Sequence, residues 1–132
     1  IVLDASAMLE VLLKTGVSTP IEARIFRGGE SLHAPHLVDL EVTQVLRRYV
    51  LAGQLSDKRG GEALQDLEDF PITRYAHSIL LPRIWELRRN VTAYDASYVA
   101  LAEALDAPLV TTDSRLASAP GHSARIELIR NT

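Results

Sequence analysis

Four acidic residues stand at or inside stretches that are otherwise apolar, and their type and placement suit metal chemistry. They are Asp4, Glu41, Asp95 and Asp113. A carboxylate in apolar surroundings is costly to desolvate, so a set of them predicts a shared use. If the fold gathers them, their mutual repulsion has to be offset by positive charge, and hard oxygen ligands suit Mg²⁺ or Mn²⁺. The set therefore predicts a metal-dependent phosphodiesterase.

Three of these acids also fit a purely structural role. Asp4, Asp95 and Asp113 stand where helices are predicted to begin, and aspartate is favoured there because it accepts hydrogen bonds from free backbone N–H groups. Glu41 differs, because it lies more than a turn inside its predicted helix, where no capping role exists. At the sequence level, capping and catalysis both stay open for the aspartates.

Two hydroxyl residues lie beside these acids along the chain. Ser6 comes two residues after Asp4, and Thr112 comes directly before Asp113. Each hydroxyl can hydrogen-bond a carboxylate or a metal-bound water, or it can cap the backbone. We predict that both support the acidic site.

Basic residues are too few for binding a polyanion by charge alone. The formal net charge is -3, from 14 basic and 17 acidic residues, so any nucleic-acid contact must be local. Arg48 lies two helical turns after Glu41 on the same side, about 10 Å further along the helix axis. We predict that it meets a phosphate next to the cleaved bond. The histidines show no ligand spacing and are not expected in the site.

Hydrophobic periodicity and turn residues predict alternating strands and helices. Strands are expected at 1–3, 32–34, 70–75, 109–112 and 126–129, and helices at 5–15, 19–28, 37–52, 56–67, 78–89, 93–105 and 114–119. This alternation predicts an α/β fold with a mostly parallel sheet, and Pro71 places its strand near an edge. Functional groups in such sheets gather beyond the carboxyl ends of the strands, where all four acids can converge.

Length and composition bound the rest. With 132 residues, of which 47% are hydrophobic, residues 1–132 are expected to form one domain with one core. The cysteine count is 0, which fits a reducing compartment, and Ile1 to Asp4 do not resemble a secretion signal. No segment approaches the roughly 20 apolar residues that span a bilayer. We therefore expect a cytoplasmic protein that is not in a membrane.

Four segments together resemble the PIN domain, and in particular the VapC-type toxins of bacterial toxin–antitoxin pairs. They are 1–7, 40–48, 92–102 and 111–116. The resemblance covers essentially the whole chain and implies a three-layer α/β/α sandwich. It maps the family's four acids onto Asp4, Glu41, Asp95 and Asp113, and its hydroxyl positions onto Ser6 and Thr112.

The resemblance also implies an activity and partners. It implies an endoribonuclease that uses one or two Mg²⁺ or Mn²⁺ ions and leaves 5′-phosphate and 3′-hydroxyl ends. It implies silencing by a small VapB-like antitoxin whose segment lies in a groove, for which Leu9, Leu12 and Leu13 are candidates besides their role in the core. An antitoxin arginine would suit the acidic cleft. A homodimer is expected as well.

Other classes of protein place an aspartate after the first strand of an α/β sheet. A haloacid-dehalogenase-like phosphatase needs a second aspartate at the position of Ser6, and a receiver domain needs a lysine late in the chain, where none occurs after Lys58. The remaining alternative is a PIN-like module that binds RNA or protein without turnover. Cleavage of RNA in the presence of a divalent ion separates it from an enzyme.

Overall fold

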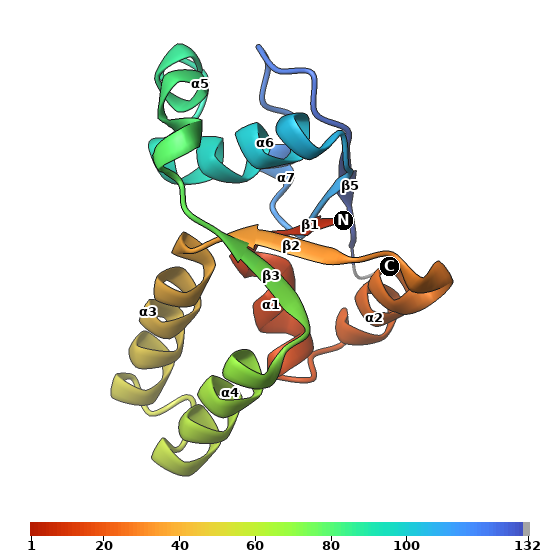
Figure 1. Ribbon diagram of the computed structural model, residues 1–132. Helices are drawn as coiled ribbons and strands as arrows, with labels where there is room; N and C mark the ends of the chain where they lie inside the picture. The colour runs from red at the N-terminus through yellow and green to blue at the C-terminus, as the bar shows by residue number, and fades with distance from the viewer. Residues whose placement is uncertain (131–132) are drawn as a thin grey trace.

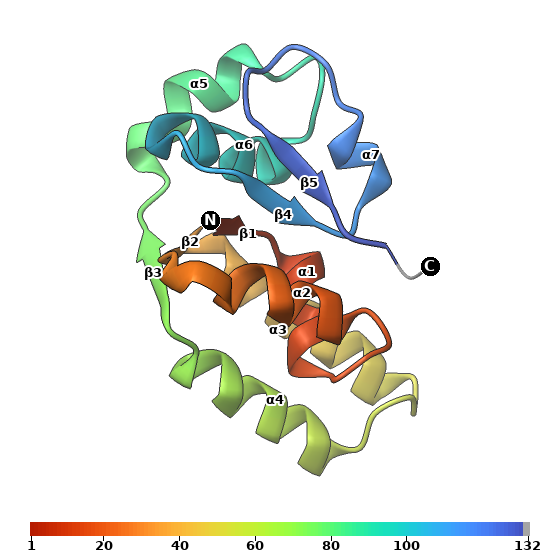
Figure 2. The same cartoon turned by 90° about the vertical axis from the view of Figure 1, so that its right-hand side faces the viewer.

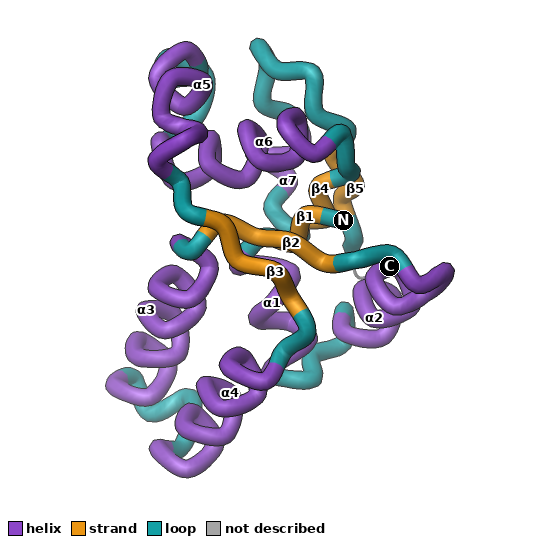
Figure 3. Tube along the Cα trace, in the orientation of Figure 1, coloured by secondary structure: helices purple, strands orange, loops and turns teal. Residues whose placement is uncertain are grey.

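The computed structural model describes residues 1–130 and is built on one five-stranded sheet (Figures 1 and 3). The strands are β1 (Val2–Leu3), β2 (Leu32–Pro35), β3 (Ile72–Tyr75), β4 (Leu109–Thr111) and β5 (Ile126–Leu128). Their order is β3-β2-β1-β4-β5, and every pairing between them is parallel. The predicted parallel sheet is confirmed, and β3, which follows Pro71, is an edge strand as expected.

Helices cover both faces of this sheet. They are α1 (Ala5–Leu12), α2 (Ser18–Phe26), α3 (Leu37–Leu51), α4 (Asp57–Asp69), α5 (Leu81–Glu86), α6 (Ala93–Leu105) and α7 (Ser114–Ala117), with short 3₁₀ turns η1 (Arg27–Gly29) and η2 (Ser78–Leu80). Figure 2 shows α5 and α6 on one face and α1, α2 and α3 on the other. The predicted three-layer α/β/α arrangement is confirmed. Within residues 1–130, no helix is long and apolar enough to cross a bilayer.

The two helices that border the carboxyl edge of the sheet are buried in different ways. Seven consecutive residues of α6, from Ala96 to Ala102, are buried, and α6 contacts β1, β2 and β4. Its alanines allow this close approach on all sides. By contrast, α3 buries only one stripe, formed by Val38, Val42 and Leu46 at intervals of four residues. Both helices therefore have fixed positions over the sheet.

The two glycines inside α4 have different packing environments. A Cβ atom built at Gly60 would lie 2.9 Å from Val50 Cγ2, whereas one built at Gly61 would meet no atom within 4 Å. Gly60 is thus the point where α4 approaches α3 closely. The gain from this packing explains why a helix forms despite the glycine cost of about 1 kcal/mol per residue.

The segment predicted as one helix over 78–89 is divided in the structure. It begins as η2, continues as the six-residue α5 with Pro82 in the first turn, and ends at Glu86. The backbone N–H of Leu87 donates to the carbonyls of both Arg83 and Ile84, which tightens the last turn. The prediction was wrong here because Leu87 turns into the core, being 1% exposed. Arg88 and Arg89 therefore lie in a loop ahead of α6.

Candidate acidic active site

Asp4 is the buried centre of the site. Leu3 pairs with Val110 across β1 and β4, so the next residues, Asp4 and Thr111, lie level at the carboxyl ends of the two central strands. Asp4 is 5% exposed. One of its oxygens accepts hydrogen bonds from Ser6 Oγ at 2.7 Å and from the backbone N–H of Ala7 at 3.0 Å, and the other accepts from Thr111 Oγ1 at 2.5 Å. Asp4 therefore caps α1, and hydrogen bonds fix the orientation of its carboxylate.

The hydroxyl that reaches Asp4 from β4 belongs to Thr111, and not to Thr112, the residue predicted to support the acids. Thr111 is the last residue of β4 and is fully buried beside Asp4. Thr112 contributes its backbone N–H, which donates to Ser6 Oγ at 3.1 Å. Thr111 Oγ1 also accepts from the backbone N–H of Asp113 at 3.0 Å. Thr111 thus links two of the acids.

Glu41 is held by a residue that the sequence analysis missed. Tyr98 on α6 donates its hydroxyl to Glu41 Oε1 at 2.6 Å. Tyr98 is 1% exposed, and burial, followed by the charge of Glu41, raises its pKa, so it stays a donor. The sequence carried one indication of the role of Tyr98, which is its spacing from Asp95. Tyr98 comes three residues later, one turn along the same helix.

Replacing Tyr98 by phenylalanine tests this role. Burial raises the pKa of Glu41 and the Tyr98 hydrogen bond opposes that rise, so Tyr98→Phe should raise it further. We expect a loss of about 1 kcal/mol in the free energy of unfolding, because a half-buried carboxylate loses its donor. Without metal, this loss should grow as the pH rises and Glu41 gives up its proton. Thermal melts in EDTA over a series of pH values measure both effects.

The matched control is Tyr94→Phe, since Tyr94 lies on the same helix and is 62% exposed. It should leave the melting temperature and its dependence on pH unchanged. If Tyr98→Phe behaved like this control, the hydroxyl would not be what holds Glu41.

Asp95 and Asp113 use their carboxylates differently. Thr92 caps α6 by accepting from the backbone N–H of Asp95 at 3.1 Å, so the Asp95 side chain is not needed as a cap. Within residues 1–130, no hydrogen bond engages the Asp95 carboxylate. Asp113 caps α7, because its Oδ1 accepts from the backbone N–H of Arg115 at 2.9 Å. Capping therefore gives a role to one oxygen of the Asp113 carboxylate, but it gives no role to the Asp95 carboxylate.

Charge coupling joins the four acids into one cluster. Burial raises the pKa of Asp4 to about 6, and its hydrogen bonds oppose this rise while repulsion from Asp95 adds to it. The pKa of Glu41 is raised by burial and again by Asp95. The pKa of Asp95 is raised by burial and then by the charge of Asp113. Asp95 thus repels acids that approach from three different elements.

These carboxylates suit a divalent cation. Within residues 1–130, no three acidic or histidine side chains are already close enough together to hold an ion. The donors are nevertheless all hard oxygens, Asp95 is unengaged, and the raised pKa values of Asp4, Glu41 and Asp95 mark negative charge that a cation would relieve. The donor set fits Mg²⁺ or Mn²⁺.

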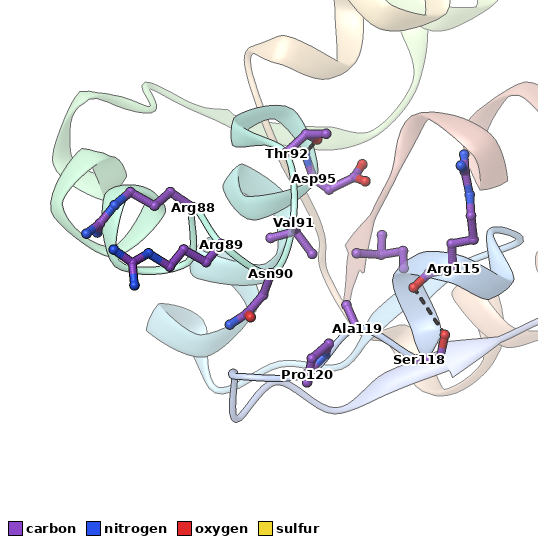
Figure 4. A pocket seen from close by; sticks show the side chains of 11 residues that line it. Arg88, Arg89, Asn90, Val91, Thr92, Asp95, Arg115, Ser118, Ala119 and Pro120 are labelled. Atoms are coloured by element: carbon purple, nitrogen blue, oxygen red, sulfur yellow. Dashed lines mark hydrogen bonds between the residues drawn. The ribbon is translucent and has the colours of Figure 1, made fainter.

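A cleft of about 630 Å³ opens beside Asp95 (Figure 4). Its lining includes Arg88 and Arg89 from the loop ahead of α6, and Arg115 from α7. Arg48, the arginine singled out from the sequence, is exposed on α3 and is not among the residues that line this cleft. From the sequence, the basic pairs Arg47–Arg48 and Arg88–Arg89 could both frame the acidic site, and only the second pair lines this cleft.

Comparisons with known proteins agree with this geometry. The family model for the PIN domain matches residues 1–121. Ribonuclease VapC1 from Mycobacterium tuberculosis is 46% identical over 130 residues, covering 98% of this chain and 97% of the relative. Ribonuclease VapC9 from the same organism is 50% identical over 116 residues, covering 88% and 87%.

A solved structure, VapBC2 from Rickettsia felis bound to a DNA fragment from their promoter, covers 98% of each chain with a TM-score of 0.70 at 14% identity. At this low identity the likeness concerns the fold. The family match and the near-full-length identities settle the relationship: this chain belongs to the PIN domain family, among the VapC ribonucleases.

Proposed function

We propose that this chain is a metal-dependent endoribonuclease and the toxin of a VapBC-like toxin–antitoxin module, with residues 1–132 as one PIN domain. The observation that carries the proposal is the buried Asp4. It sits with Glu41, Asp95 and Asp113 in one repulsive cluster at the carboxyl ends of β1 and β4, beside a cleft lined by arginines. A fold keeps such a costly arrangement where the charges have a use.

Each residue has a distinct role in the proposed site. Asp4, Glu41 and Asp95 would hold one or two Mg²⁺ or Mn²⁺ ions, with Asp113 assisting directly or through water. A bound divalent ion supplies activation of water and neutralisation of phosphate charge. The chain itself supplies orientation, because every oxygen of Asp4 is fixed by a donor. Tyr98 fixes Glu41 in the same way.

The proposed reaction is hydrolysis of an RNA phosphodiester bond that leaves 5′-phosphate and 3′-hydroxyl ends. Proteins read RNA mostly in single-stranded loops and ends, where the backbone can enter a narrow site. The cleft beside Asp95 suits such a strand. Ser6 and Thr112 support this reaction indirectly. The backbone N–H of Thr112 donates to Ser6 Oγ, and the Ser6 hydroxyl in turn donates to the Asp4 carboxylate.

The proposed partners follow from the VapC relationship. A small VapB-like antitoxin would silence the enzyme, and the cytoplasm is the compartment where its RNA substrate lies. Of the three leucines suggested for an antitoxin groove, Leu12 is buried in the core and Leu9 and Leu13 are partly buried. The proposal includes a homodimer, which exposed apolar side chains near the starts of α3, α5 and α6 and in η2 support. They are Leu40, Ile79, Leu81 and Tyr94.

An RNA cleavage assay tests the proposal. Purified protein should cut RNA with Mg²⁺ or Mn²⁺, and EDTA should stop the reaction because the carboxylates alone cannot neutralise the phosphate. The Asp4→Asn variant, purified in parallel, should give no cleavage, which excludes a contaminating nuclease. A catalytically silent module would cut no RNA under any divalent ion, and that result would refute the enzyme.

A further inference from the structure

Four arginines outside the cleft are already paired with acids. Arg24 binds Glu127, Arg74 binds Asp39 and Arg83 binds Glu103, with closest N–O distances of 2.6, 2.8 and 2.8 Å. Arg125 binds Asp106 at 2.8 Å. These pairs satisfy both partners, so their positive charge is not available to a ligand.

The arginines of the cleft beside Asp95 are different. Arg115 is 95% exposed and lies 4.0 Å from its nearest acid, Asp113. Arg88 donates to the backbone carbonyl of Trp85 and not to an acid. Within residues 1–130, no hydrogen bond or ion pair engages the side chain of Arg89. A chain with a net charge of -3 thus places three arginines without a close acidic partner around this cleft.

These arginines lie on both sides of the acidic site. In Figure 4, Arg115 lies on one side of Asp95 and the Arg88–Arg89 pair on the other, with the side chains of Arg88 and Arg89 extending away from Asp95. Arg115 also lowers the pKa of Asp95, so its charge is felt at the carboxylate. A polyanion that crosses Asp95 would therefore meet a cation before the acid and another after it. An arginine guanidinium is suited to phosphate because its N–H groups form a planar fork.

The loop that carries the arginine pair is braced. A Cβ atom at Gly121, whose φ is +91°, would lie 2.0 Å from Asn90 Nδ2, so the loop is seated directly against the 121 turn. Arg83 holds α5 to α6 through Glu103 at 2.8 Å and reaches the Gly121 carbonyl at 3.4 Å. The side chains of Arg88 and Arg89 therefore start from a fixed backbone.

Trp85 adds a flat surface at the same end. It is 67% exposed, and the Arg88 guanidinium lies 4.6 Å from its ring centroid. Stacked arginine and aromatic side chains are the surfaces on which unpaired bases stack. An unpaired base next to a phosphate bound by Arg88 could pack there.

We propose that Arg88 and Arg89 on one side and Arg115 on the other bind the phosphates that flank the scissile phosphate of a single-stranded RNA. This inference rests on the proposed function, because it takes Asp95 as part of the cleavage site. It assigns substrate positioning to the cleft arginines. Arg48 on α3 would then contribute little to binding.

Binding without cleavage tests the inference. A fluorescein-labelled single-stranded RNA of mixed sequence is titrated with protein in EDTA, and anisotropy is recorded at several salt concentrations. Arg88→Ala/Arg89→Ala should weaken binding roughly tenfold at physiological salt, and should reduce the slope of log K against log salt by about 1.4, at about 0.7 per phosphate contact. Arg115→Ala should reduce the slope by about 0.7.

The control is Arg27→Ala/Lys58→Ala, which removes the same charge from exposed positions outside the cleft. It should leave the slope unchanged. Arg88→Lys/Arg89→Lys should restore most of the slope, which a purely structural role for the loop would not predict. Arg89→Ala alone serves if the double variant is unstable, because no partner of Arg89 is lost within residues 1–130.

Equal losses in the cleft variant and the control, or an unchanged slope in the cleft variant, would overturn the inference. A loss as large in Arg48→Ala as in the cleft variant would also overturn it. In the cleavage assay, the cleft variants should raise KM more than they lower kcat. Protein that binds RNA with the expected slopes but never cleaves it would contradict the proposed function while supporting this inference.

Discussion

Asp95→Asn should lower RNA cleavage by roughly a thousandfold or more, because it removes the charge of a proposed metal ligand that no neighbour can replace. Burial raises the pKa of both Asp4 and Glu41, and the charge of Asp95 adds to both rises, so its charge is felt at both carboxylates. Within the described residues its carboxylate has no hydrogen-bonding role, and Thr92 supplies the cap of α6. The loss should therefore be one of chemistry, with the fold intact.

Cleavage rates and Mn²⁺ titrations of the same preparation check this expectation. Thermal melts should show Asp95→Asn at least as stable as the wild type in EDTA, since repulsion within the cluster falls. Asp66→Asn is the control, because Asp66 is exposed on α4 and its replacement changes the charge equally. Unimpaired cleavage by Asp95→Asn would remove this residue from the site.

Asp4→Asn should stabilise the metal-free protein at neutral pH by on the order of 3 kcal/mol. The pKa of Asp4 rises from 3.8 to about 6 in the fold, so the folded state binds this proton more tightly than the unfolded state does. Stability that depends on the proton is then fully present below about pH 4 and is lost as the pH rises through about 6. An asparagine loses no proton, so the variant avoids this loss.

Denaturant unfolding in EDTA from pH 4 to pH 8 measures the effect. The two proteins should differ least near pH 4 and most above pH 6. Saturating Mn²⁺ should then stabilise the wild type more than the variant, because an ion that binds only the folded state adds to its stability. A difference independent of pH, or a variant less stable at every pH, would contradict the burial of a charged Asp4.

Both expectations follow from one property of the site, which is that its acids destabilise the metal-free fold and suit a bound ion. Without a cation, burial and repulsion at Asp4 destabilise the fold, while three donors from Ser6, Ala7 and Thr111 keep its carboxylate in one orientation. That orientation is useful only when an ion is bound. Marginal stability in the metal-free state is therefore an expected property of the site.

Local patterns in the sequence were sufficient for much of this fold. Strand ends and helical spacing depend on neighbours along the chain, so the parallel sheet and the edge position of β3 could be predicted. The four acids could also be selected, because a carboxylate in an apolar stretch is unusual wherever it folds. Their convergence followed from the rule that parallel strands end at a common edge.

Only the tertiary structure decided which side chains surround the acids. Whether Thr111 or Thr112 reaches Asp4 depends on the register and side-chain direction between β1 and β4, which lie more than a hundred residues apart along the chain. The pairing of Tyr98 with Glu41 needs two helices from different layers to meet. Arg88 and Arg89 face the cleft because α5 ends where Leu87 turns into the core. These contacts join distant segments, and no local propensity encodes them.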